Sequence, residues 1–271
     1  MKIVSFNVNS IRTRLHQLDG VIKKHSPFII ALQETKVHDS EFPVSDIENL
    51  GYTANYFGQK GHYGVAVLSK ENPVEIIKGF SSDSSDAQRR IISCKFKLSD
   101  NKTLTVINGY FPQGENRNHP VKFPAKQKFY SDILVHLNNH FKKDENLLVV
   151  GDMNIAPENI DIGLGGDNPK RWLREGKCCF LPEEREMISR VFNWGLFDTY
   201  RKVYPQKYDI FSWFDYRSKG FESEPKRGLR IDLMLATQTL LQKVTGAGID
   251  YEIRGMERPS DHCPVWTEFN I

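Results

Sequence analysis

The sequence is poor in cysteine and lacks long apolar runs. Only four residues of 271 are cysteine, at positions 94, 178, 179 and 263, and no CxxC pair or Cys/His zinc spacing occurs. This pattern argues against a disulfide framework and a thiolate metal centre, and it predicts reduced thiols that are at least partly buried. The longest apolar stretches, such as residues 28–32, are far too short to cross a bilayer.

The first residues also lack the features of a secretory signal. Residues 1–7 already have the pattern of a strand, without an apolar leader or a small-residue cleavage site. A cytoplasmic location is therefore expected. No dimer interface is visible in the sequence, so a monomer is expected as well.

Charge is nearly balanced, with a formal net charge of +3, so the chain is not a strongly basic nucleic-acid coat. Basic residues nevertheless gather locally, and such groups are usually solvated faces. The alternative is a surface that follows phosphates around a separate acidic centre. The groups are Arg89-Arg90, Lys122 with Lys126 and Lys128, Lys170-Arg171 with Arg174 and Lys177, and Lys226-Arg227 with Arg230.

Strand-like and helix-like segments alternate along the whole chain, which predicts one domain over residues 1–271. Apolar or β-branched runs predict strands at 2–8, 28–33, 64–69, 90–98, 104–110, 146–151, 230–236 and 264–269. Amphipathic spacing and end signals predict helices at 15–24, 125–141 and 182–194.

The strand patterns predict the α/β class. Residues 147–150 are apolar throughout, as in a strand buried on both faces, whereas residues 104–108 partly alternate. This mixture fits two sheets packed face to face with helices outside, and the pattern alone does not choose that arrangement over one doubly wound sheet.

Polar side chains recur near the ends of the predicted strands, where a sheet holds catalytic groups rigidly. They are Asn7, Glu34, Asn108 with Tyr110, Asp152, Asn154, Asp232, and the pair Asp261-His262. Most have a purely structural interpretation. Asn7 and Asp152 suit caps or turns, Glu34 suits an exposed strand end, and Asn108-Gly109 is a standard hairpin signal. Asp232 is harder to explain, because a carboxylate amid apolar residues is costly unless it is paired.

Taken together, these donors suit phosphodiester hydrolysis. Mg²⁺ prefers one or two carboxylates with water and phosphate oxygens, and Glu34 with Asn7 and Asp261 meets that demand. Asp152 and Asn154 point to the same side if the backbone stays extended there, so that one takes a proton from water while the other donates to the phosphoryl oxygen. An acid such as Asp232 is suited to orient His262 and keep it protonated.

On these residues the chain resembles the exonuclease–endonuclease–phosphatase superfamily and, within it, the exonuclease III family of abasic-site endonucleases. The shared blocks cover essentially the whole chain. Those common to the superfamily are LQETKV (32–37), GDMN (151–154) and SDHCPV (260–265). Those that look like abasic-site endonucleases are NGYFPQG (108–114), KRWLREGK (170–177), WFDYRSKGF (213–221) and GLRIDLML (228–235). SFNVNSIR (5–12) and GHYGVAVL (61–68) also match.

The resemblance implies a four-layer sandwich of two packed mixed sheets flanked by helices, with the active site at one edge of the sheets. It implies Mg²⁺-dependent hydrolysis on the 5′ side of abasic sites in duplex DNA, with Mn²⁺ as a substitute metal. Exonuclease action from 3′ to 5′ and removal of blocked 3′ ends are implied too. A general deoxyribonuclease, an inositol-phosphate or sphingolipid phosphoesterase, and a non-catalytic DNA-binding module are the alternatives.

The resemblance also implies a role for each matching residue. The catalytic residues would be Tyr110, Asp152, Asn154, Asp232 and His262. Glu34 would be the principal metal ligand, within a set that includes Asn7, Asp152, Asn154 and Asp261. The residues that contact DNA would be Arg90, Gln113, Trp213, Leu229 and Ile231.

The last three of those residues would wall a pocket for a sugar without its base, because an unpaired nucleotide costs least to extrude. From the residues alone, strand core is the favoured interpretation of the aromatic side chains at 211–216, for all except one ring. Residues 163–168, although rich in glycine, do not match a GxGxxG phosphate fingerprint and predict a surface loop.

Overall fold

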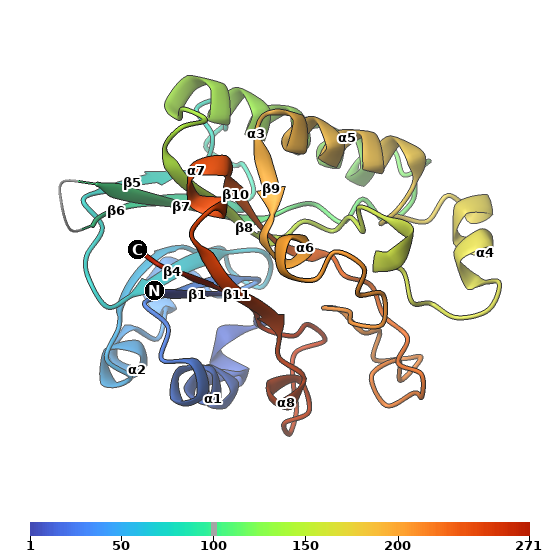
Figure 1. The fold of residues 1–271 in the computed structure, drawn as a ribbon, viewed down its shortest axis with the longest axis horizontal. Helices are drawn as coiled ribbons and strands as arrows, with labels where there is room; N and C mark the ends of the chain where they lie inside the picture. Colours follow the sequence, from blue (N-terminus) through green and yellow to red (C-terminus); the bar gives the residue numbers. More distant parts are fainter. Residues whose placement is uncertain (99–101) are drawn as a thin grey trace.

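Two six-stranded sheets pack face to face in the computed structural model, which describes residues 1–98 and 102–271 (Figure 1). In sheet order, the first consists of β11 (Val244–Ile249), β12 (Val265–Phe269), β1 (Lys2–Asn7), β2 (Ile29–Gln33), β4 (Val65–Ser69) and β3 (Thr53–Phe57). The second consists of β5 (Glu75–Lys78), β6 (Ile91–Lys97), β7 (Thr103–Tyr110), β8 (Asn146–Asp152), β10 (Asp232–Thr237) and β9 (Leu196–Asp198).

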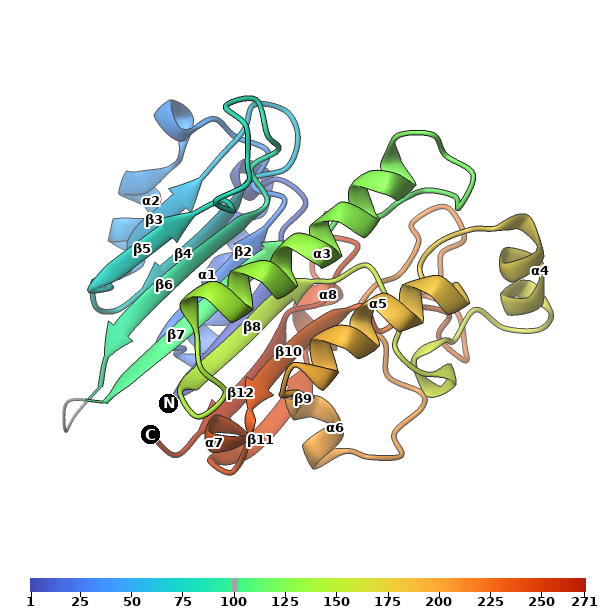
Figure 2. The same cartoon turned by 90° about the horizontal axis from the view of Figure 1, so that it is seen from above.

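Helices cover the outer face of each sheet and complete four layers (Figures 1 and 2). On the first sheet lie α1 (Leu15–His25), α2 (Val44–Asn49) and α8 (Tyr251–Arg254), and on the second lie α3 (Lys122–His140) and α5 (Pro182–Asn193). The others are α4 (Asn168–Glu175), α6 (Thr199–Val203) and α7 (Gln238–Leu241), with 3-10 turns at Ile11–Thr13, Asp39–Glu41 and Asn159–Asp161. The predicted four-layer α/β sandwich is confirmed.

Three apolar cores explain this layering. One lies between the two sheets and includes Ile29 and Val67 of the first sheet with Val106 and Val150 of the second. The other two lie between each sheet and its helices. Strands such as β8 are buried on both faces, which accounts for their continuous apolar sequence.

Strand direction brings polar residues to one edge. β1 and β2 run parallel, as do β7 and β8, while the other paired strands run antiparallel. Asn7 is therefore level with Gln33, and Tyr110 is level with Asp152. The carboxyl ends of these strands supply the site described below.

A polar bridge joins the two sheets inside the core. Asn108 is fully buried within β7, and its Nδ2 donates to the backbone oxygens of Leu32 at 2.9 Å and Ala66 at 2.8 Å. Gln33 donates from Nε2 to Asn108 Oδ1 at 2.7 Å. The interpretation of Asn108-Gly109 as a hairpin turn is wrong, because these residues continue a strand paired on both sides.

Other expectations fare differently. The four cysteines are free and buried, as predicted. Residues 163–167 form a loop that leads into α4. Three members of the basic groups are not on the surface: Arg90, Lys126 and Arg230 are buried. Lys126 is ion-paired with Glu184, and Arg230 is ion-paired with Asp161 and Asp198. Among the described residues, no helix is long and apolar enough to cross a membrane.

Candidate active site

Three neighbouring strands of the second sheet place their functional side chains in one row. Tyr110 ends β7 and is level with Asp152 at the end of β8, which is level in turn with Asp232 at the start of β10. Asp232 is therefore the first residue of its strand. The sequence had predicted that it lies inside a strand that begins at residue 230, and that expectation is wrong. Asp152 and Asp232 are only 2% and 3% exposed, so each carboxylate depends on partners inside the protein.

The first sheet contributes from the opposite side. Asn7, at the end of β1, is fully buried and donates from Nδ2 to Asp152 Oδ2 at 3.0 Å. Glu34 follows β2 in a left-handed conformation, with φ of 52°, and its side chain reaches the same cavity as Asp152. The site is thus assembled from both sheets, as the resemblance implies.

A cavity of about 250 Å³ collects most of the predicted residues. Its lining consists of Glu34, Tyr110, Gln113, Asp152, Asn154, Trp172, Cys179, Trp213, Leu229, Ile231, Asp261 and His262. Asn7 and Asp232 do not line it, but they bond directly to Asp152 and His262. Distant segments therefore converge on one small volume.

His262 is held between two carboxylates. Its Nδ1 lies 3.0 and 2.9 Å from the two oxygens of Asp232, and its Nε2 lies 3.7 Å from Asp152 Oδ2. Burial alone would lower the pKa of this imidazole, but Asp232 and then Asp152 raise it to about 10. A cationic imidazole at the cavity is suited to contact a phosphate oxygen.

Burial raises the pKa of Asp152 to about 7, against the opposing effect of His262 and with support from Asp232 and Glu34. Burial and the carboxylates of Glu34 and Asp152 also raise the pKa of Tyr110 well above its usual value, so this phenol stays a proton donor at neutral pH. The cavity therefore concentrates negative charge with little solvent to screen it.

This charge fits a divalent cation. The carboxylates of Glu34, Asp152 and Asp261 line the same cavity, whereas His262, protonated and bonded to Asp232, is not a metal ligand. Oxygen donors of this kind suit hard cations such as Mg²⁺ or Mn²⁺, which would also relieve the repulsion among the carboxylates. The described residues in this lining include one thiol, Cys179, whose pKa burial raises to about 12, so it is no thiolate ligand at neutral pH.

Asp261 joins the carboxylate side of the cavity to its aromatic wall. Its Oδ1 accepts from Asn9 Nδ2 at 2.9 Å, and its Oδ2 accepts from Trp213 Nε1 at 3.0 Å. Burial opposes the charge of Asp261, but His262, Asn9 and Trp213 keep its pKa below the usual value. Lys36 continues this series of side-chain contacts: its Nζ lies 2.5 Å from Asn9 Oδ1 and 3.4 Å from Glu34 Oε1.

Asn154 reaches the cavity by a different route from the predicted one. The backbone after Asp152 does not stay extended, because Asn154 has φ of 51°. Its backbone N–H donates to Asp152 Oδ1 at 3.0 Å, and its Nδ2 donates to the backbone oxygen of Phe111 at 3.0 Å. Both side chains line the cavity even so.

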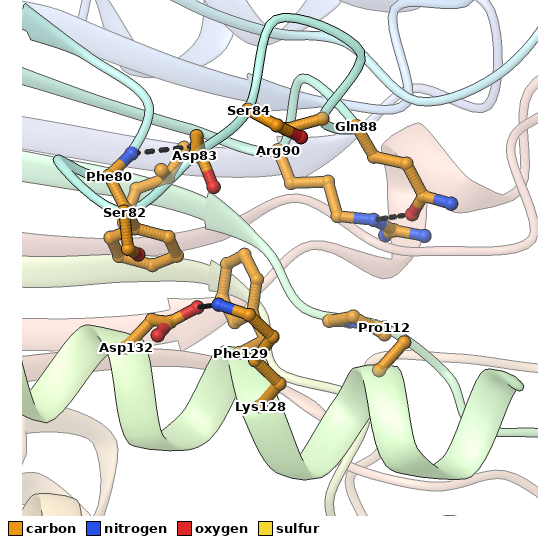
Figure 3. Close-up of a pocket in the computed structure, with 13 residues that line it drawn as sticks. Phe80, Ser82, Asp83, Ser84, Gln88, Arg90, Pro112, Lys128, Phe129 and Asp132 are labelled. Carbon is orange, nitrogen blue, oxygen red and sulfur yellow. Dashed lines mark hydrogen bonds and ion pairs between the residues drawn. The ribbon is translucent and has the colours of Figure 1, made fainter.

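Arg90 lies beside this cavity and lines a second one, of about 190 Å³ (Figure 3). Its Nε donates to Gln88 Oε1 at 2.6 Å, and its Nη1 donates to the backbone oxygen of Tyr110 at 3.0 Å. The guanidinium stacks over Tyr63 and Tyr110 at 4.1 and 4.7 Å from the ring centroids. Arg90 is thus fixed against the residue that ends β7.

Sequence reasoning missed four contributors. Trp172 and Cys179 line the cavity, and Asn9 and Lys36 bond to its carboxylates. Trp172 lies in the block KRWLREGK, which the resemblance had already marked, whereas Cys179 carried no signal beyond that of a buried thiol. The roles of Asn9 and Lys36 depend on contacts between segments far apart in the chain.

Known proteins are similar to this chain over nearly its whole length. The Endonuclease/Exonuclease/phosphatase family matches residues 4–262. Exodeoxyribonuclease III of Haemophilus influenzae is 53% identical over 269 residues, which cover 99% of this chain and 100% of the relative. An AP endonuclease structure from Archaeoglobus fulgidus aligns over 100% of both chains with a TM-score of 0.90 and 34% identity. A Neisseria 3′ phosphatase bound to a product DNA hairpin aligns over 100% of both chains with a TM-score of 0.88 and 32% identity.

Proposed function

Because the chain belongs to the Endonuclease/Exonuclease/phosphatase family, we propose that it is a DNA-repair phosphodiesterase of the exodeoxyribonuclease III type. It hydrolyses duplex DNA on the 5′ side of abasic sites and also acts as a 3′-to-5′ exonuclease that cleans blocked 3′ ends. The observation that carries this proposal is the cluster of Asp152, Asp232 and His262 in a cavity with a tryptophan and aliphatic wall.

In this proposal each step has its own side chain. Asp152, oriented by Asn7, takes a proton from the attacking water, whose oxygen bonds to phosphorus as the bond to the leaving oxygen breaks. His262, kept cationic and oriented by Asp232, contacts the negatively charged phosphoryl oxygens. Tyr110 and the amide of Asn154 donate hydrogen bonds to the phosphate.

A divalent metal, Mg²⁺ by preference with Mn²⁺ as substitute, supplies charge neutralisation at the phosphate when it is bound. Glu34 is the principal ligand in this proposal, with Asn7, Asp152, Asn154 and Asp261 as the remaining donors. The support is the lining of one cavity by Glu34, Asp152, Asn154 and Asp261, the bond of Asn7 to Asp152, and the raised pKa of Asp152, which a nearby cation would lower.

Substrate selection rests on the wall made by Trp213, Leu229 and Ile231. Leu229 and Ile231 are 0% and 2% exposed, and the backbone of Trp213 pairs with that of Leu229 and of His262. A pocket built this tightly against the catalytic histidine admits an extruded sugar and excludes one that still carries a base. Arg90 and Gln113 contact the DNA backbone beside it.

Three substrates decide among the candidate functions. Purified protein with Mg²⁺ is given a duplex with one abasic analogue, the same duplex intact, and a soluble inositol polyphosphate. We expect incision at the analogue to be the fastest reaction, slow release of nucleotides from 3′ ends, and no release of inositol phosphate; EDTA should stop all cleavage. Equal internal incision of the two duplexes would leave a general deoxyribonuclease, and binding without any cleavage would leave a DNA-binding module.

The expected location and assembly state belong to the same proposal. We propose a monomer in the cytoplasm, and the four free, buried cysteines support the location because they suit a reducing compartment. Cell fractionation tests the location, and light scattering of the purified protein tests the monomer.

A further inference from the structure

Lys126 is a fully buried cation that the proposed chemistry does not use. It lies on α3, and its Nζ donates to the backbone oxygens of Gln113 at 3.1 Å and Asn154 at 2.8 Å. Its third partner is the carboxylate of Glu184 on α5, at 2.5 Å, and both side chains are 0% exposed. All three ammonium protons therefore have acceptors, and two of these acceptors belong to residues of the candidate active site.

A second side chain of α3 binds the loop after β8, which contains Met153 and Asn154. Tyr130 lies one helical turn after Lys126, is 2% exposed, and donates from its hydroxyl to the backbone oxygen of Met153 at 2.7 Å. The successive carbonyls of Met153 and Asn154 are thus held by two buried residues that lie one turn apart on the same helix.

Packing leaves these loops little freedom to shift. Gly114 has φ of 89°, and a Cβ there would lie 3.1 Å from Lys126 Cδ and 2.9 Å from Cys178 Sγ. Asn154, in the loop after β8, also has a positive φ. Its side-chain amide donates to the backbone oxygen of Phe111, in the loop after β7, and so joins the two loops. A positive φ at a residue other than glycine is strained, and it persists only where surrounding contacts enforce it.

Stability alone is a weak explanation for the ion pair. A buried pair of charges is often no more stabilising than apolar residues of the same volume. Here, however, apolar replacements would leave the carbonyls of Gln113 and Asn154 buried without a donor. The specific result of the arrangement is the relative position of two loops.

We propose that Lys126 and Tyr130, with Glu184 as counter-ion, are positioning residues that hold Asn154 and Gln113 in place at the phosphate. The packing of α3 against α5 thereby sets the geometry of a site that neither helix contacts with a catalytic residue. The consequence for activity rests on the function proposed above, whereas the consequence for loop order does not.

The test compares the double variant Lys126→Met/Glu184→Gln, which removes both charges together, and the single variant Tyr130→Phe with the wild-type enzyme. Displacement of a transition-state group by about 1 Å lowers rates roughly 10²-fold, so we expect such a fall in single-turnover cleavage for the double variant and a smaller fall for Tyr130→Phe. The half-saturating Mg²⁺ concentration should change less than the rate, because Glu34, the principal ligand in the proposal, follows β2 of the other sheet, and of the remaining donors only Asn154 bonds to Lys126. The control Glu186→Gln/Arg190→Gln, which removes an exposed pair from α5, should keep the wild-type rate.

Hydrogen exchange gives a readout independent of activity. The backbone amides of Asn154 and Ala156 should exchange faster in the double variant, while those in the interior of β8 should not. A purely structural role would lower the melting temperature and leave single-turnover rates and loop exchange unchanged well below it, and that result would overturn the proposal.

Should the double variant not fold, Tyr130→Phe decides, and wild-type rate and exchange in it would overturn the proposal. If the wild-type protein cleaves no DNA, the proposed function fails, and the exchange experiment still tests the positioning of the loops.

Discussion

Asp152, at the end of β8 in the second sheet, accepts from Asn7 of the first sheet and lies beside the imidazole of His262. Substitution of Asp152 by Asn removes the proton acceptor but keeps the shape of the side chain. We expect kcat for abasic-site cleavage to fall by about 10²–10⁴, since general base catalysis contributes on that order. Asp144→Asn, an exposed carboxylate before the other end of β8, is the matched control for a steady-state assay. Retained turnover in the Asp152 variant would place the base elsewhere.

Trp213 has two separable features, its ring and its N–H, which donates to Asp261. Trp213→Ala should lower the ratio of incision at an abasic analogue to exonuclease release more than it lowers exonuclease turnover itself, because the pocket wall is lost. Trp213→Phe keeps a ring, and its ratio of abasic-site incision to exonuclease release should lie between the ratios of the wild-type protein and of Trp213→Ala. Parallel gel assays of both activities measure this, with Tyr208→Ala as an exposed aromatic control. A larger loss of exonuclease turnover would argue against the pocket assignment.

For single residues, the sequence predicts well which side chains belong to the site, but it predicts poorly the backbone conformation that places them there. Glu34, Asp152 and His262 stand in short blocks whose chemistry is legible from residue type and spacing. The positive φ of Asn154 and the contacts of Asn9 with Asp261 and Lys36 are not legible, because they depend on how distant segments meet. The assigned roles themselves stay predictions until variants are assayed.

The strand pair β7–β8 depends on two glycines that face each other. Gly151 has φ of 139°, and a Cβ there would lie 1.9 Å from the backbone oxygen of Gly109. Gly151→Ala should therefore cost about 2–5 kcal/mol of unfolding free energy, from backbone strain and overpacking together. Urea unfolding measures it, and Gly51→Ala is the control, with φ of 84° but nothing within 4 Å. Equal costs would show that φ alone matters.

A buried histidine on α3 makes the fold sensitive to acid. Burial, with a smaller effect of His140, lowers the pKa of His136 from 6.5 to about 4. The unfolded chain then binds more protons than the folded chain between these values, so stability is fully present above pH 6.5 and falls as pH drops towards 4. This pKa difference corresponds to about 3 kcal/mol.

His136→Gln stays neutral at every pH and keeps a polar partner for Ser93. Its unfolding free energy, from urea titrations between pH 4 and 7, should decline less steeply than that of the wild-type protein. His62→Gln, which replaces an exposed imidazole, should follow the wild-type slope. Parallel slopes for His136→Gln and the wild type would show that His136 does not titrate with folding.

Elements differ in how far the sequence predicts them. Buried strands such as β2, β4 and β8 are continuous apolar runs, and their bounds were predicted within a few residues. β3, β5, β9 and β11 were not predicted, since they are short, partly exposed or, in β11, interrupted by glycine. Such edge strands owe their conformation to pairing with a neighbour more than to their own pattern.

Because the candidate metal donors come from both sheets, a bound cation should stabilise the whole molecule. A ligand that binds only the folded state raises the melting temperature by mass action. Addition of Mg²⁺ should therefore shift one cooperative transition upward, and a single transition also tests the predicted single domain over 1–271. In Glu34→Gln the shift should vanish, whereas in Glu71→Gln, an exposed control, it should persist. An undiminished shift in the Glu34 variant would remove Glu34 from the metal site.

The hydrogen bonds of Asn108 across the inter-sheet core have an evolutionary consequence. Its amide donates to carbonyls of β2 and β4, and Gln33 donates to its side-chain oxygen. An apolar residue at either position would therefore leave buried polar atoms without a hydrogen-bond partner. Among homologous sequences, positions 33 and 108 should consequently covary: an apolar residue at one position is expected only where the residue at the other position has changed as well.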